Sequence, residues 1–288
     1  MLLVFPPFGG EAYVGIAEDL LPLERYQDAR QILRNAVEKR LDIDGVHKDL
    51  YALGFVAKDA AAMDTEAKWL ESRPEYANLG LSLESDTQAY FGHLVKARVL
   101  SSRAVDAGVH SDNREAAALW RANSALREAL FGDRLRASHF AAESIKMAPA
   151  SQSTQIEAAL AFALAGDRAR ALSFEQDLDK RFPLDTQVQM VWLPTIRAQL
   201  ALLSGEPERA VSHLQKAVPV QLGSTTFSTS ISCLYALQVR GDDYLALRDG
   251  NSAAREFQKI LHHPGIVWNY PTGALARLGL PVPMVSRL

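Results

Sequence analysis

FGHLVKARVL (91–100), FGDRLRASHF (131–140) and LAGDRARALS (164–173) are three versions of one pattern, in which a glycine precedes an alanine by five residues. LSGEPERAVS (203–212) is a fourth version, and two earlier stretches fit with Glu24 and Lys58 in place of the glycine. The anchors of the six stretches are Ala29, Met63, Ala97, Ala137, Ala171 and Ala210. Successive anchors are 34, 34, 40, 34 and 39 residues apart, which indicates a repeated structural unit.

The residues around each anchor suit a pair of antiparallel helices joined by a tight turn. Closely crossing helices need small side chains at the crossing, and a turn glycine supplies the positive φ that ends the first helix. Pro149 and Pro183 each follow their own anchor by twelve residues, and a last unit has Arg248 at the turn and Ala253 as anchor. This arrangement resembles the tetratricopeptide (TPR) repeat. It predicts an all-α fold, a right-handed TPR α-solenoid of about seven helix-turn-helix repeats.

The same pattern predicts where the chain divides. We expect an irregular N-terminal segment at 1–10, a TPR superhelix at 11–264, and a truncated further repeat or irregular tail at 265–288. The polar stretch 219–231 has no helical period and is expected to loop out between the sixth and seventh pairs, as a candidate gate. The extra residues of the two long intervals indicate either longer helices or wider turns. The uncapped ends leave two interpretations open, ragged natural ends or a piece of a longer protein.

Composition excludes several classes of function. Lys and Arg number 31 and Asp and Glu 34, a net charge of −3, which argues against a nucleic-acid groove. A single cysteine, Cys233, excludes an internal disulfide framework and a CxxC site. The longest apolar run, 158–165, has eight residues, whereas a membrane helix needs about 20. We therefore expect neither a nucleic-acid partner nor a membrane segment in this chain.

The sequence lacks the common motifs for catalysis and metal binding. The sequence has no Gly-Lys pair for a phosphate-binding loop and no HRD, DFG or HExxH motif. His139 and Glu143 are four residues apart, but two ligands without a third favour a solvated helix pair over a metal site. The sequence predicts no catalytic residue, no metal site and no cofactor.

A solenoid of helix pairs presents a concave face that suits an extended peptide or a partner helix. The first helices of the repeats would line it, and aromatic residues there would be the energetic anchors. The predicted partner-binding residues are Asp86, Tyr90, Asn123, Trp192, Gln199, Tyr235 and Asp242. The alternative for each is packing against the neighbouring repeat. The oligomeric state does not follow from the sequence.

Three charged residues occupy a position of the first helix that usually holds leucine. They are Glu84, Arg197 and Arg240. Either the helix is rotated locally and the charges are solvated, or they form an internal network or polar pocket, because buried charges must be paired.

Several longer stretches resemble one family more closely than the general repeat. EKRLDIDGVHKDLYALGF (38–55), RFPLDTQVQMVWLPTIRAQLAL (181–202) and AREFQKILHHPGIV (254–267) are similar to the C-terminal TPR region of bacterial, notably acidobacterial, serine/threonine protein kinases. Related regions follow winged-helix DNA-binding domains in some regulators. The resemblance, over about 24–280, implies a non-catalytic partner-binding or sensory tail of a signalling kinase, or else the sensor half of a regulator. A free-standing chain would be cytoplasmic, whereas the tail of a membrane-anchored kinase could be extracytoplasmic.

Overall fold

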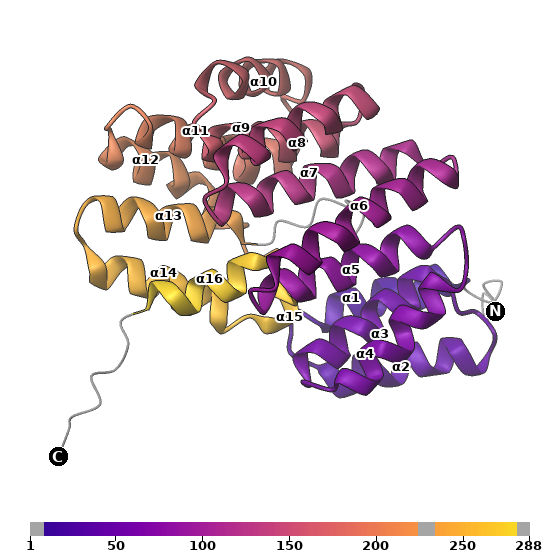
Figure 1. Ribbon diagram of the computed structural model, residues 1–288. Helices are drawn as coiled ribbons and strands as arrows, with labels where there is room; N and C mark the ends of the chain where they lie inside the picture. The colour runs from indigo at the N-terminus through magenta and orange to yellow at the C-terminus, as the bar shows by residue number, and fades with distance from the viewer. Residues whose placement is uncertain (1–8, 224–233, 281–288) are drawn as a thin grey trace, which may run out of the picture.

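The computed structural model describes residues 9–223 and 234–280, which fold into seven antiparallel helix pairs (Figure 1). The pairs are α1 (Gly10–Leu20) with α2 (Tyr26–Glu38), α3 (Asp44–Val56) with α4 (Ala60–Glu71), α5 (Ala77–Tyr90) with α6 (Leu94–His110), α7 (Arg114–Leu130) with α8 (Arg134–Met147), α9 (Gln152–Ala165) with α10 (Arg168–Arg181), α11 (Leu193–Leu202) with α12 (Pro207–Leu214), and α13 (Tyr235–Ala246) with α14 (Gly250–Leu261). The short α15 (Pro264–Val267) and α16 (Pro271–Gly279) follow. No strand occurs in the described ranges, which confirms the predicted all-α fold.

The turns within the pairs have the backbone conformation that the glycine pattern predicts. Gly92, Gly132, Gly166 and Gly205 have φ between 74° and 88°. The residues that replace the glycine in other repeats, Glu24, Lys58 and Arg248, also have positive φ, between 57° and 60°. A residue with a side chain loses about 1 kcal/mol in this conformation. The repeat geometry therefore imposes the turn even where the sequence does not favour it.

The anchors lie where the paired helices cross. Every alanine anchor, including Ala253 of the last pair, is completely buried. Met63 is the one large anchor, and the facing position on α3 is Gly54, whose missing side chain leaves room for it: a Cβ there would lie 3.0 Å from the Met63 Cγ. Close packing at the crossing therefore needs a small residue on one of the two helices, but not always on the second one.

The two long repeat intervals have different causes. In the 40-residue interval, α6 and α7 are each 17 residues long. In the 39-residue interval, a π-helical turn (Val188–Trp192) precedes α11, just before Pro194, which has no N–H to continue an α-helical ladder.

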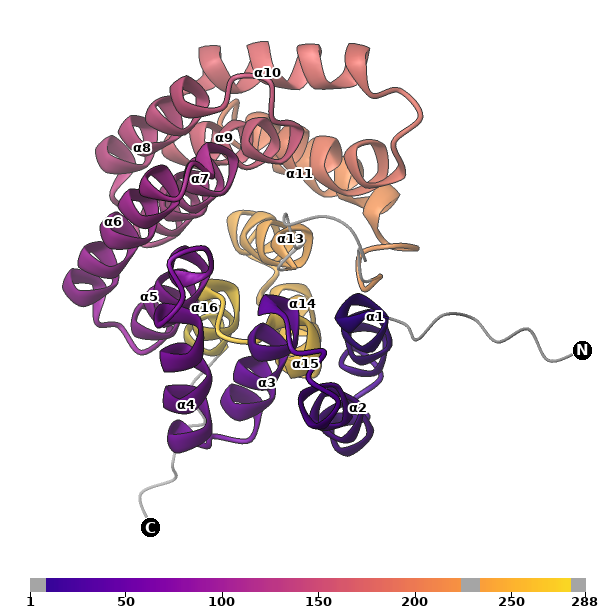
Figure 2. The same cartoon turned by 90° about the vertical axis from the view of Figure 1, so that its right-hand side faces the viewer.

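The pairs curve into an arc, with α5, α7, α9 and α11 on its inner side and α6, α8 and α10 outside (Figure 2). The C-terminal helices lie inside this arc and reach back to the first repeats. Asn269, between α15 and α16, donates from Nδ2 to the Leu83 carbonyl (2.8 Å) and to the Thr87 Oγ1 (3.0 Å) of α5. The end of the chain therefore closes part of the concave side. The helix α16 packs on α14 and α13. That it begins a truncated eighth repeat stays a prediction.

Some of the predictions from the sequence concern residues that the structure does not describe. These are 1–8, within the segment predicted to be irregular, Cys233, and most of the candidate gate, from residue 224 onward. Across the described residues, no helix combines the length and apolar character needed to cross a membrane.

Candidate functional site

The two aromatic residues predicted as anchors of a binding surface lie in the core. The side chain of Trp192 is 2% exposed and that of Tyr235 is 3% exposed, and their ring centroids are 6.0 Å apart. Both belong to the apolar cluster between the central repeats. Both side chains pack against the neighbouring repeat, as the alternative interpretation expects, and neither lies on an open surface. Their part in partner binding stays a prediction.

Of the five remaining predicted site residues, three are also buried and a fourth is hydrogen bonded to a neighbouring side chain. Asp86, Asn123 and Gln199 are buried, and Asp242 accepts hydrogen bonds from the Gln238 side chain at 3.2 and 3.3 Å. Tyr90 alone of the seven lines the pocket described below. The structure therefore does not bring the predicted residues together in one site.

Asp86 belongs to a buried polar network that joins three helices. Arg127 of α7 donates from Nη1 to the Asp86 Oδ1 (2.9 Å) and to the Ser85 Oγ (2.9 Å) of α5, and from Nη2 to Ser101 of α6. Burial raises the pKa of Asp86 to about 6, against the opposing effect of Arg127. Because its groups are satisfied by one another, this network holds the third and fourth repeats together and is structural.

Asp243 of α13 is a buried carboxylate of a different kind. Neither of its oxygens accepts a hydrogen bond from a described residue, although the side chain is completely buried. Burial and the neighbouring Asp242 carboxylate raise the pKa of Asp243 to about 8. A buried acid of this kind is stable in its neutral form and costs folding free energy when it ionises.

We expect Asp243→Asn to gain stability relative to the natural protein as the pH rises from about 4 to about 8. The pKa is higher in the folded state than in the unfolded one, so the stability contributed by the neutral acid is lost as the pH rises through the folded value. The variant's advantage should reach at least about 2 kcal/mol at the upper end. Urea unfolding at several pH values measures it, with the exposed Asp106→Asn as control. Parallel stability curves for the natural protein and the Asp243 variant would contradict the prediction.

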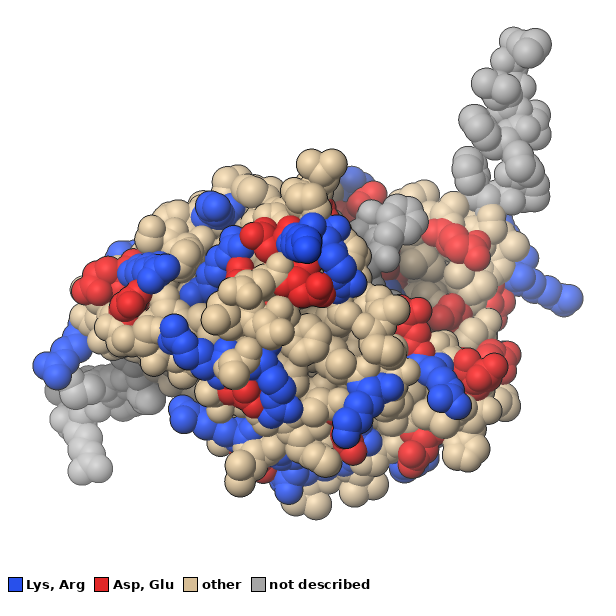
Figure 3. Space-filling view, turned by 90° about the horizontal axis from the view of Figure 1, so that it is seen from above, with Lys and Arg blue, Asp and Glu red and all other residues tan. Residues whose placement is uncertain are grey.

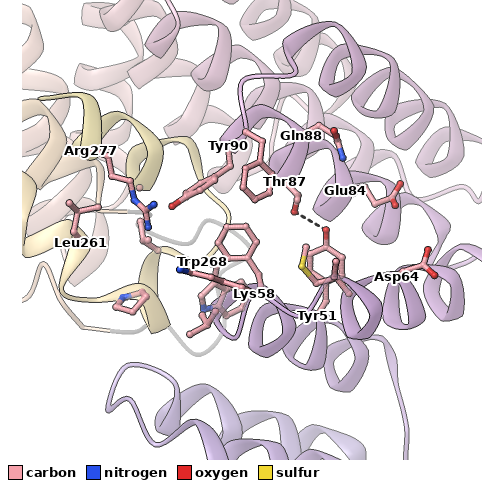
Figure 4. Close-up of a pocket in the computed structure, with 18 residues that line it drawn as sticks. Tyr51, Lys58, Asp64, Glu84, Thr87, Gln88, Tyr90, Leu261, Trp268 and Arg277 are labelled. Carbon is pink, nitrogen blue, oxygen red and sulfur yellow. Dashed lines mark hydrogen bonds between the residues drawn. The ribbon is translucent and has the colours of Figure 1, made fainter. Parts of the chain in front are cut away.

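A pocket of about 540 Å³ opens between α3, α4 and α5 on one side and α14, α15 and α16 on the other (Figure 4). Aromatic side chains form much of its lining. They are Tyr51, Phe55, Tyr90, Phe91 and Trp268. This volume lies within the range of about 300–1,000 Å³ that is usual for ligand-binding cavities.

The pocket wall is fixed by contacts between helices. The Tyr51 hydroxyl and the Thr87 Oγ1 are hydrogen bonded at 2.7 Å, next to the Asn269 contact. Phe55 packs edge-on against Tyr90, with ring centroids 5.0 Å apart, whereas Phe91 is 60% exposed at the rim. The site therefore combines a rigid interior with an accessible aromatic edge.

Charged side chains of opposite sign lie at opposite ends of this pocket. Arg277 of α16 sits over the Tyr90 ring, 5.8 Å from its centroid, while Glu84 and Asp64 are at the α4–α5 end (Figure 4). Glu84 is half-buried, and burial, then the nearby Glu71 carboxylate, raises its pKa.

Sequence reasoning identified Glu84 as unusual but missed the pocket itself. Two thirds of the lining residues lie within 51–91 and the rest within 261–277, and the repeat pattern gives no signal that these segments meet. Within the described residues, no group of three or more His, Cys, Asp or Glu side chains could hold a metal ion. On the face in Figure 3, basic and acidic side chains are interspersed.

Comparison with known proteins supports the fold. No protein-family model matches the chain, and no curated protein matches it. Among solved structures, a tetratricopeptide repeat protein from Parabacteroides merdae is similar, with a TM-score of 0.51 and 15% sequence identity over 94% of this chain and 98% of that one. The fold is a TPR α-solenoid. The TPR pattern in the sequence is thus confirmed by the helix pairs and by this structural neighbour.

Proposed function

We propose that this TPR chain is a non-catalytic protein-interaction scaffold that docks a segment of a partner protein in the aromatic pocket on its inner side. The observation that carries the proposal is the pocket itself, in which aromatic rings surround a preformed cavity beside an exposed ring at the rim. Aromatic side chains are the usual anchors of protein interfaces because they bury a large area with few rotatable bonds. Tyr90 is the residue that this site shares with the concave-face prediction.

The experiment is a selection of phage-displayed random peptides on the immobilised full chain. Clones enriched on the natural protein are counter-selected on a Phe55→Asp variant, which places a charge inside the pocket. Recovery of peptides that bind only the natural protein supports the pocket as a docking site. If every enriched peptide binds both proteins equally, the pocket is not the site.

Replacing Phe91 by alanine should raise the dissociation constant of a selected peptide about tenfold. This is the effect expected for losing an exposed aromatic contact at an interface. Folding stability should be nearly unchanged, because Phe91 is 60% exposed. Fluorescence anisotropy with the labelled peptide measures the dissociation constant. Phe131→Ala is the matched control, since Phe131 occupies the same place before a turn glycine one repeat later, outside the pocket. Equal losses in the two variants would argue against the proposal.

We further propose that the scaffold serves a signalling system of the serine/threonine kinase type. What supports this is the resemblance of the stretches quoted above to the TPR regions of such kinases. An immunoblot of native cells against the repeat region tests it, together with the coding sequence immediately upstream. A band near 31.6 kDa would indicate a free-standing adaptor, for which we propose a cytoplasmic location. A larger band with an upstream kinase domain would indicate the tail of that kinase, and an upstream winged-helix domain would favour the regulator instead.

A further inference from the structure

We infer that the pocket selects a partner segment of defined charge order, with an apolar or aromatic side chain in the cavity, a basic residue toward Glu84 and an acidic group toward Arg277. This inference rests on the proposed function and adds the chemistry of the partner. It requires that the two charges be available, that they be well separated, and that most of the wall between them be aromatic or apolar.

Glu84 is available at the acidic end. Among the described residues its carboxylate forms neither a hydrogen bond nor an ion pair, although Lys96 and Arg103 lie near enough to influence it electrostatically. Its neighbour Asp64 is already paired with Lys68 at 2.6 Å, where both side chains are exposed. Glu84 is therefore a half-buried acceptor at the edge of an aromatic cavity, which a Lys or Arg side chain can reach without displacing an existing partner.

Arg277 is available at the basic end. It is exposed, and its one interaction with a described residue is the contact with the Tyr90 ring. A guanidinium held over an aromatic face keeps its N–H groups free for a carboxylate. Lys58 also lines the pocket, and Figure 4 places it between the two ends.

Aromatic and apolar side chains form most of the wall between the two ends, with Lys58 and Thr87 as polar residues among them. Figure 4 shows Tyr51 and Trp268 between Arg277 and Glu84, and Phe55, Met63 and Val267 add further apolar lining. A basic side chain entering beside aromatic rings gains cation–π attraction as well as the Glu84 contact. The charge order on the walls also gives the bound segment one direction, because the reversed segment would place like charges together.

The test uses peptides recovered by the pocket-dependent selection described above. Their consensus should contain an apolar or aromatic residue with Lys or Arg on one side and Asp or Glu on the other. Glu84→Gln should raise the dissociation constant of such a peptide about tenfold, whereas the exposed Glu75→Gln, outside the pocket, should not change it. A peptide in which the basic residue is replaced by glutamate should bind Glu84→Lys more tightly than it binds the natural protein.

The outcomes separate this inference from the function on which it rests. Peptides that depend on Phe91 but lack a basic residue, or that bind Glu84→Gln normally, would overturn the charge order and leave the docking pocket intact. The absence of any pocket-dependent peptide would overturn the docking function itself. Thermal unfolding of Glu84→Gln and Glu84→Lys confirms that the variants are folded before binding is compared.

Discussion

Replacing Arg240 by methionine is expected to lower the free energy of unfolding by about 3–5 kcal/mol, the cost of breaking a buried ion pair by removing one partner. The Arg240 side chain is 2% exposed and that of its partner Glu256 is 8% exposed. Its Nη2 donates to the Glu256 Oε2 at 2.6 Å and to the Gln221 Oε1 at 2.7 Å, and its Nη1 donates to the Leu214 carbonyl at 3.2 Å. These bonds tie α13 to α14, to the last residue of α12 and, through Gln221, to the segment after α12.

Urea unfolding followed by circular dichroism measures this effect, and two further variants show its cause. Arg240→Met combined with Glu256→Leu should recover part of the loss, because the buried carboxylate, which would keep only its ion pair with Lys259 (2.7 Å), is then removed as well. Arg197→Leu should cost less, about 2 kcal/mol, since its side chain is 25% exposed and one of its two partners, Asp179, is 44% exposed, although the other, Glu175, is 9% exposed. A loss for Arg240→Met no larger than that for Arg197→Leu would show that the buried network contributes little.

Replacing Gly265 by alanine is expected to release α15 and α16 from the first three repeats and to cost about 3 kcal/mol, as overpacking does when backbone must move. A Cβ at this position would overlap the carbonyl oxygen of Leu21 and would lie 2.8 Å from its carbonyl carbon. These are backbone atoms at the end of α1, which cannot turn aside as a side chain can. Because Trp268 and Arg277 belong to the released segment, the same variant should lose peptide binding in the pocket.

Hydrogen exchange over residues 264–279 is the direct measurement for Gly265→Ala, and faster exchange there is expected. Gly250→Ala is the matched control, because nothing lies within 4 Å of the Cβ it would add. Unchanged exchange together with normal peptide binding would mean that the C-terminal helices tolerate the side chain and that the close approach to Leu21 is unimportant.

The position of Arg240, Arg197 and Glu84 in the repeat was readable from the sequence, but their environments were not. All three occupy the repeat position that usually holds leucine. Arg240 is nevertheless buried in a network, whereas Arg197 is partly exposed beside Glu175 and Asp179. Glu84 faces a pocket. The difference arises because each repeat has different neighbours on its inner side. The same is true of Trp192 and Tyr235. Their position in the repeat predicts that they lie on the concave side, but it does not show whether that side is open to solvent or filled by other helices.

The sequence by itself determined the helix pairs, their number and their turns, because these depend on contacts within about 34 residues and recur with the spacing of small residues and glycines. Only the tertiary structure decided that the chain closes upon its own first repeats. The contacts from Asn269 to Leu83 and from Gly265 to Leu21 join residues far apart in the sequence, and no local pattern encodes such a meeting. The pocket is formed by that closure, so its aromatic walls and its charge order appear only when the two ends of the solenoid are placed together.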